Sequence, residues 1–282
     1  MTENAFIRQT IALTVRELKH WYRDKMQIFM ALIQPLIWLG LFGTMMSGTI
    51  GSVIPDFFTF LALGMVVITA LTTAMSSGMS LVWDRRFGFL DKLRAAPIPR
   101  GVIPLSRVLA TTVKAVIQSA MVFVIALMLG LKVTGFGVWS IPIAILVIVG
   151  VTLIFSTIFV TFGMVIKSQE VFMGINMLLM MPIMFVSGAM FPLSMMGNIE
   201  GALGAALTVI AKYNPLTWAS DAMRMAFLSD SALNPVGPMG EPISMLSLPD
   251  LSIGVSILIL MITAVFVTVL GMIISKRALV TK

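Results

Sequence analysis

The stretch FFTFLALGMVVITALTTAMSSGMSLV, residues 57–82, contains no Asp, Glu, Lys or Arg and is followed at once by WDRRFGFLDKLR, residues 83–94. At about 1.5 Å per helical residue, this apolar run is long enough to cross the roughly 30 Å hydrocarbon core of a bilayer. Of the 282 residues in the chain, 59% are hydrophobic and 11% are charged, against about 25% charged in a soluble domain. The composition therefore predicts a multi-pass membrane protein and excludes a soluble enzyme, a disordered chain and a disulfide-rich secreted domain.

Five further apolar runs of similar length surround this one. Backbone polar groups in lipid must be satisfied within the segment itself, so each run is predicted to be an α-helix. The predicted spans are residues 26–48, 57–82, 105–131, 139–166, 171–191 and 251–275. We therefore expect an all-α membrane domain covering residues 1–282, with six transmembrane helices. Two shorter apolar runs within residues 199–228 are interrupted by polar residues, and we expect them to form re-entrant helices at the outer face.

The basic residues predict the orientation of the chain. With the N-terminus inside, sixteen of the nineteen Lys and Arg residues lie inside, and Lys132, Lys212 and Arg224 lie outside. Because Lys and Arg are enriched in cytoplasmic loops, both termini are predicted to be cytoplasmic. Topology thus explains the net charge of +7, and nucleic acid is excluded as a partner. The first 25 residues hold no apolar core of a signal peptide, so none is expected.

Residues 5–24 are predicted to form an amphipathic helix along the inner membrane surface. Ile7, Ile11, Val15, Leu18 and Tyr22 fall on one face of such a helix. The basic residues that would form the adjacent face are Arg8, Arg16, Lys19 and Arg23. This pattern suits a helix that lies in the lipid headgroups. It can be a plain anchor, or an interface helix that also touches a cytoplasmic partner.

The loop after the second span is the most charged part of the chain. Phe87, Leu90 and Leu93 are spaced three residues apart, which gives a short helix one apolar edge. The charged residues around that edge include Asp84, Arg85, Arg86, Asp91 and Lys92. Pro97 prevents the helix from continuing. A helix of this kind over residues 84–94 fits a socket on a partner protein, although a solvated loop would need no partner.

Few residues in the predicted spans can carry chemistry. Lys114 is the one charged residue well inside a span, about two turns from its inner end, where it can snorkel to the interface. Without deeper ionisable groups, transport driven by protons or sodium is disfavoured. One histidine, His20, and no cysteine exclude a histidine or thiolate metal cluster, so we expect no catalytic, metal or cofactor residues. The chain also has no GxxxxGK[ST] phosphate loop, so energy for uphill transport must come from elsewhere.

Polar residues within the spans mark a candidate translocation path. Hydroxyl residues at helical spacing run along the second span, and single amides occur in the first, in the third (Gln118) and in the fifth. The candidate residues are Thr69, Thr72, Thr73, Ser76, Gln34 and Asn176. Such residues either hold helices together in lipid or line a polar path, and the sequence leaves both interpretations open.

Asp221 and Arg224 are predicted to form an outer gate. They are three residues apart in a short helix that begins after Asn214 and Pro215, where proline suits the first helical position. Charges that dip into the outer bilayer surface are costly unless they are paired. We therefore expect this pair to hold a wedge at the outer membrane edge.

The order of these elements resembles the membrane subunits of type-2 ABC exporters. Three stretches carry the resemblance: RDKMQIFMALIQPLIWL, WDRRFGFLDKLRAAPIPR, and FPLSMM followed later by YNPLTWASDAMR. Phe89 departs from the pattern, because many relatives carry Thr after the glycine. The resemblance spans essentially the whole chain, and the exporters of drugs and other small amphiphiles are its nearest fit.

The resemblance implies a permease that is no enzyme on its own and holds no cofactor. Two copies of a separate ABC ATPase would bind ATP and Mg²⁺, and a second permease copy or a paralogue would complete a dimer in the inner membrane of a prokaryote. Residues 84–94 would be the coupling helix. The alternatives are a permease for polysaccharides or lipid-linked glycans, a membrane assembly protein without transport activity, and a channel. A channel is disfavoured because the spans carry no filter motif.

Overall fold

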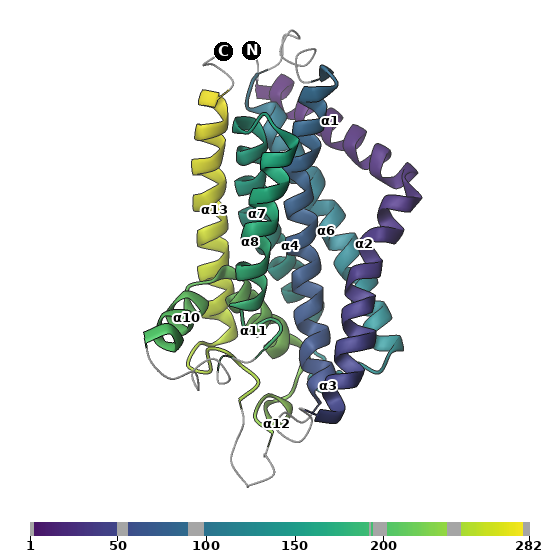
Figure 1. Cartoon of the computed structure of the whole chain (residues 1–282), viewed down its shortest axis with the longest axis vertical. Coiled ribbons are helices and arrows are strands. Elements are labelled where there is room, and N and C mark those ends of the chain that lie inside the picture. The colour runs from purple at the N-terminus through teal and green to yellow at the C-terminus, as the bar shows by residue number, and fades with distance from the viewer. Residues whose placement is uncertain are drawn as a thin grey trace.

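The computed structural model describes residues 3–49, 56–89, 99–191, 193, 202–235 and 244–278, and these residues form helices and no strands. In chain order the helices are α1 (Glu3–Arg23), α2 (Lys25–Ile37), η1 (Trp38–Gly43), α3 (Thr44–Thr49), α4 (Phe57–Arg86), α6 (Val102–Met128), α7 (Ser140–Val165), α8 (Gln169–Phe185), α10 (Ala202–Lys212), α11 (Pro215–Phe227), α12 (Asp230–Leu233) and α13 (Ile253–Ala278). The long helices run side by side (Figure 1). α1 and the end of α13 lie at one end of the bundle, the α1 end, and α10–α12 lie at the other, the α11 end.

Five described helices are long and apolar enough to cross a membrane. They are Lys25–Met46, Phe57–Arg86, Val102–Met128, Ser140–Val165 and Ile253–Ser275. The predicted all-α, multi-pass architecture is therefore confirmed. The expected span over 171–191 differs, because α8 has 17 residues and is about 25 Å long, short of a roughly 30 Å hydrocarbon core.

α8 ends at Phe185 because the next residues turn to contact other elements. Ser187 Oγ donates to Met184 O at 2.7 Å, and Gly188 N donates to Thr217 Oγ1 at 3.3 Å. The turn also lies against the backbone of α4, where a Cβ on Gly64 would collide with Ala189 O. Hydropathy alone does not separate such a packed turn from the end of a span.

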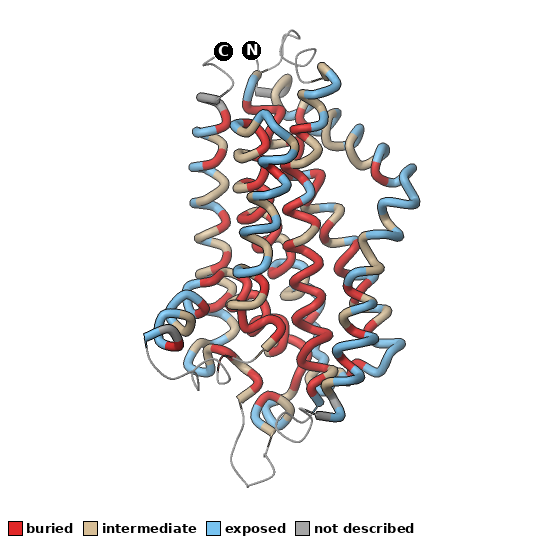
Figure 2. Tube along the Cα trace, in the orientation of Figure 1, coloured by how far each residue is buried: buried red, intermediate tan, exposed pale blue. Residues whose placement is uncertain are grey.

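α4 is the central helix of the bundle. In the most apolar window of each span, 89% of the residues are buried in α4, against 17% in Lys25–Met46 and 17% in α13 (Figure 2). α4 packs chiefly on α7 and α6. α4 and α7 cross closely at Gly78 and Gly163, because a Cβ on either glycine would collide with a backbone carbonyl of the other helix. Small residues allow this approach in lipid, where packing provides the attraction between helices.

The first span is not the straight helix expected over residues 26–48. α2 passes into the π-helix η1 and then into α3. Pro35 lies inside α2 and lacks an N–H, and Trp38 N donates to both Gln34 O and Pro35 O. A proline followed by a wider π turn is a known cause of local distortion in a helix.

α1 crosses the end of the bundle, and a break at Asp24 separates it from α2 (Figure 1). Asp24 Oδ1 caps α2 by accepting from Gln27 N at 3.0 Å. The predicted apolar face is open, since Ile7, Ile11 and Tyr22 are 51%, 56% and 74% exposed. A different face, including buried Thr10 and Trp21, packs against the protein. The open apolar face suits the lipid surface predicted for residues 5–24.

Candidate functional site

A charged cluster ties three helices together at the α1 end. Arg107 of α6 is buried and donates to Glu17 Oε2 of α1 at 2.5 Å and to Ser80 Oγ of α4 at 3.1 Å. It also pairs with Asp84 of α4. Because one buried guanidinium serves two carboxylates on different helices, removing it would deprive both of the cation that they share, and Glu17 would keep only the exposed Arg16 at 3.9 Å. The cluster therefore fixes α1 and the end of α4 to α6.

The end of α4 is bonded to two more helices. Arg85 donates to Ile166 O at 3.0 Å and to Met164 O, both at the end of α7. Arg86 donates to Gln169 Oε1 at the start of α8 at 3.0 Å. We expected Asp84, Arg85 and Arg86 to form contacts with an ATPase, and the structure gives each of these groups a partner within the chain. They therefore attach the start of the loop to α6, α7 and α8.

The chain turns directly after α4. Gly88 has a φ of +69°, a conformation that glycine adopts readily. Phe87 is 78% exposed, whereas the ring of Phe89 lies 4.0 Å from the guanidinium of Arg16 on α1. The remaining residues predicted for coupling, Leu90, Asp91, Lys92 and Leu93, lie outside the described residues, as does the rest of the expected helix to residue 94. The described part of the loop therefore offers one exposed aromatic side chain.

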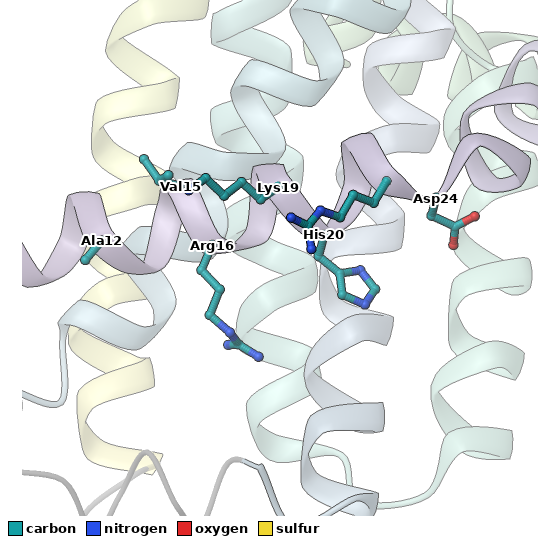
Figure 3. A pocket seen from close by; sticks show the side chains of 7 residues that line it. Ala12, Val15, Arg16, Lys19, His20 and Asp24 are labelled. Carbon is teal, nitrogen blue, oxygen red and sulfur yellow. The ribbon is translucent and has the colours of Figure 1, made fainter.

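α1 presents a basic surface. The four predicted residues, Arg8, Arg16, Lys19 and Arg23, are all exposed. An open hollow of about 840 Å³ lies along the helix. Figure 3 shows its side chains, which belong to Ala12, Val15, Arg16, Lys19, His20, Arg23 and Asp24. Asp24 is the one acid among them, so the hollow carries excess positive charge and suits an anionic surface.

A second hollow, the polar cavity, lies between α1, α2, α4 and α6. Its volume is about 220 Å³. The side chains that line it are Trp21, Gln27, Ala31, Gln34, Thr72, Thr73, Ser76, Lys114 and Gln118. Four of the six residues predicted for a translocation path therefore meet in one cavity. Polar side chains in a membrane span characteristically face such a cavity or one another.

The other two predicted path residues lie elsewhere. Thr69 is 1% exposed, and its hydroxyl donates to Met65 O at 2.8 Å within α4. Asn176 is half-buried on α8, a helix that contributes nothing to the polar cavity. Thr69 lies on the same predicted row as Thr72 and Thr73, but it is buried between helices and does not line the polar cavity. The row of hydroxyls thus serves helix packing at one end and the polar cavity at the other.

Lys114 lies in the polar cavity about two helical turns along α6 from Arg107. It makes no hydrogen bond or ion pair with any residue that the structure describes. Gln118, one turn further along α6, accepts the Thr73 hydroxyl at Oε1 at 2.6 Å. A basic side chain thus faces amides and hydroxyls, and no carboxylate lines the cavity with it.

The predicted outer-gate pair is buried inside the protein at the α11 end. Arg224 Nη1 lies 3.3 Å from Asp221 Oδ1, and the two side chains are 0% and 1% exposed. Arg224 also donates to Phe60 O at 3.4 Å and Ala189 O at 3.0 Å, and its guanidinium lies 3.6 Å from the centre of the Phe60 ring. Asp221 accepts from the backbone N of Ser247 and Leu248 at 3.0 and 2.8 Å.

This position differs from the wedge that we expected at the outer membrane edge. The pair joins α11 to α4, to the turn after α8 and to the segment before α13, which is the geometry of a fixed anchor. Burial raises the pKa of Asp221 and lowers the pKa of Arg224 to about 10, so Arg224 remains charged at neutral pH. The expectation of Pro215 at the start of the helix is confirmed, and Asn214 Oδ1 accepts from Leu216 N at 3.0 Å.

Sequence reasoning missed the roles of Arg107 and Glu17. In the sequence, Arg107 is only one of the sixteen basic residues that indicate the cytoplasmic side. Glu17 lies 90 positions away from it in the chain. Because their partners are on different helices, no spacing in the sequence indicates these contacts. Gln118 could be predicted, since an amide in an apolar helix needs a partner or a cavity, and its bond to Thr73 holds α6 to α4.

The fold defines the chain as a multi-pass α-helical membrane protein. Comparison of its sequence with known families identifies which kind of membrane protein it is. The family model for the ABC-2 type transporter matches residues 8–228, so the chain belongs to this family. Members of this family are permease subunits, which span the membrane and are not themselves catalytic. The resemblance found on the three quoted stretches is confirmed.

Similar proteins cover most of the chain. It is 29% identical to ycf38 of Porphyra purpurea over 272 residues, which are 94% of this chain and 86% of that protein. It is 26% identical to ycf38 of Cyanophora paradoxa over 268 residues, 93% of this chain and 87% of that protein. Both bear a provisional name as transport permeases. It is also 25% identical to the daunorubicin resistance ABC transporter permease protein DrrB1 of Streptomyces coeruleorubidus over 199 residues, 70% of this chain and 67% of that protein.

Proposed function

We propose that this chain is the permease of an ATP-driven exporter that moves an amphiphilic substrate out of the cytoplasm. A separate ABC ATPase, present in two copies, would bind ATP and Mg²⁺, and a second permease copy or a paralogue would complete the complex. The proposed location is the inner membrane of a prokaryote, with the α1 end and both termini in the cytoplasm. The distribution of basic residues supports this orientation.

The attachment of the end of α4 is the observation that carries the proposal. Asp84, Arg85 and Arg86 bind α6, α7 and α8, so a force on the loop that follows would reach three helices at once. The loop extends from the most buried helix of the bundle. A loop with only the role of a linker has no need for three such attachments.

Purification of the complex tests the proposal. The tagged chain, extracted from its native membranes in a mild detergent, is expected to retain an ABC ATPase in equal copy number. In liposomes the complex should move a fluorescent amphiphile in the direction away from the ATPase, and only with ATP and Mg²⁺. A chain that retains no ATPase would support the alternative of an assembly protein. A complex that moves only glycan polymers would support the glycan-exporter alternative.

The size of the polar cavity favours small amphiphiles over glycan polymers. Its volume of about 220 Å³ is below the roughly 300–1,000 Å³ of sites that enclose a drug-sized ligand. A polymer would need a wider and longer channel. A cavity of this size can hold the polar head of an amphiphile while the apolar part remains in lipid.

A further inference from the structure

We propose that the polar cavity binds the anionic headgroup of an amphiphile, with Lys114 as the counter-charge. The inference deepens the proposed function by naming a substrate class, and it rests on that function only for the transport step. Binding itself requires the permease alone.

The first argument is the uncompensated charge of Lys114. Among the nine residues that line the polar cavity it is the only charged one. Glu17, an acid close enough to act electrostatically on Lys114, is already paired with the buried Arg107 at 2.5 Å. Arg107 itself adds positive charge close by. A lysine inside a membrane span without a bonded acid is costly, and an anionic ligand would remove that cost.

The second argument is the supply of hydrogen-bond donors. The Lys114 ammonium has three N–H groups, and the Gln27, Gln34 and Gln118 amides have two each. Oε1 of Gln118 is occupied by the Thr73 hydroxyl, whereas its Nε2 donates to none of the described residues. The hydroxyls of Thr72 and Ser76 already donate to Thr69 O and Thr73 O, at 3.1 and 2.7 Å. The free donors of the cavity are therefore the N–H groups of Lys114 and of the amides, and such groups suit phosphate or carboxylate oxygens.

The third argument is access from the bilayer. Gln27 and Gln34 line the cavity from α2 and are both exposed. The span that contains them is 17% buried in its most apolar window, so the wall at α2 is thin. The cavity lies about two helical turns inward from Arg107, close to the α1 end. A headgroup in the leaflet at that end could enter past α2 and leave its acyl chain in lipid.

Trp21 supplies a reporter for the test, because it lines the polar cavity and is 6% exposed. A variant that keeps Trp21 as the sole tryptophan is purified in a neutral maltoside detergent. The four residues changed to Phe are Trp38, Trp83, Trp139 and Trp218. Its fluorescence is followed while dodecyl phosphate is added, and separately with dodecyltrimethylammonium and with inorganic phosphate.

We expect saturable binding of dodecyl phosphate at a concentration at least about tenfold below that of the chain-matched cation. Inorganic phosphate should bind at least tenfold more weakly than dodecyl phosphate. Lys114→Gln should remove the preference for the anion, and Lys114→Arg should keep it. Lys132→Gln, which removes an exposed lysine at the α11 end, should change neither titration and serves as the matched control.

Equal binding of the two amphiphiles, or an unchanged preference in Lys114→Gln, would overturn the proposal and leave Lys114 as a snorkelling residue. Inorganic phosphate binding as tightly as dodecyl phosphate would also overturn it, in favour of a free anion. If the sole-tryptophan variant does not fold, the wild-type chain and Lys114→Gln are titrated calorimetrically with the same probes. Their preference for the anionic over the cationic amphiphile then decides the proposal in the same way. ATP-driven export without an anionic preference would refute only this inference. Anion binding by a chain that retains no ABC ATPase from its native membranes would refute only the proposed function.

Discussion

Replacing Arg224 with methionine is expected to destabilise the α11 end severely. The substitution keeps much of the volume of the side chain and removes its charge. It deletes the ion pair with Asp221 at 3.3 Å, the hydrogen bond to Ala189 O at 3.0 Å and the contact with the Phe60 ring at 3.6 Å. Because Arg224 is 0% exposed, water does not replace these partners.

The magnitude follows from the burial of both partners. Removing one member of a buried ion pair costs about 3–5 kcal/mol, because the other charge remains buried without its partner. Asp221 keeps two backbone donors, Ser247 N and Leu248 N, which limits the loss to this range. Adding Asp221→Asn removes the unpaired charge and keeps an oxygen for one donor. The double variant should therefore recover about 1–3 kcal/mol relative to the sum of the single losses.

The assay is reversible unfolding of the purified chain in mixed micelles, with the free energy of unfolding compared among the four members of the cycle. Lys132→Met is the matched control, because Lys132 and Asp56 form a pair at 2.7 Å that is 64% and 51% exposed. An exposed pair of this kind is worth less than about 1 kcal/mol. A loss below 1 kcal/mol for Arg224→Met, or strict additivity in the double variant, would refute the anchor interpretation. Lost export at unchanged stability would instead support the predicted outer gate.

Arg107→Met should release α1 from the bundle, because it leaves Glu17 and Asp84 without their shared cation. Protease cleavage within residues 3–23 should then become at least about tenfold faster in detergent. The chain has no cysteine, so Asn234→Cys should react with an impermeant maleimide only from outside the cell and Lys19→Cys only from inside. The opposite labelling pattern would contradict the proposed orientation. Leu90→Asp combined with Leu93→Asp should abolish the stimulation of ATP hydrolysis by the permease and leave its membrane insertion unchanged. Normal stimulation in that variant would contradict the coupling role of the loop.

The spans could be predicted because the membrane imposes one simple condition on a helix. A run such as residues 57–82 must satisfy its backbone internally and contain few charges, and both properties are visible in a single segment. The structure places α4 over Phe57–Arg86, close to that expectation. The departures occur where tertiary contacts compete with hydropathy. Residues 186–190 are apolar enough to continue α8, yet they form the turn that provides Ala189 O to Arg224.

The candidate site could be predicted only in part, for a related reason. Thr72, Thr73 and Ser76 share one helix face, so their spacing in the sequence is enough to predict that they lie together. Lys114 and Trp21 reach the same cavity from other helices, and no one-dimensional pattern links them. Asp221 and Arg224 were correctly paired by their spacing of three residues. Their depth could not be predicted, because it depends on Phe60 and Ala189, which are distant in the chain.

The junction at Asp24 decides which part of the cavity wall would move most if α2 tilted. Because α1 is held to α6 through Glu17 and Arg107, a tilt of α2 relative to α1 would turn about Asp24. At about 1.5 Å per residue, Gln27 lies about 4.5 Å from this pivot and Gln34 about 15 Å. A swing of about 10° would therefore displace Gln27 by less than about 1 Å and Gln34 by about 2.6 Å. Such a tilt would widen the cavity more at Gln34 than at its Trp21 side.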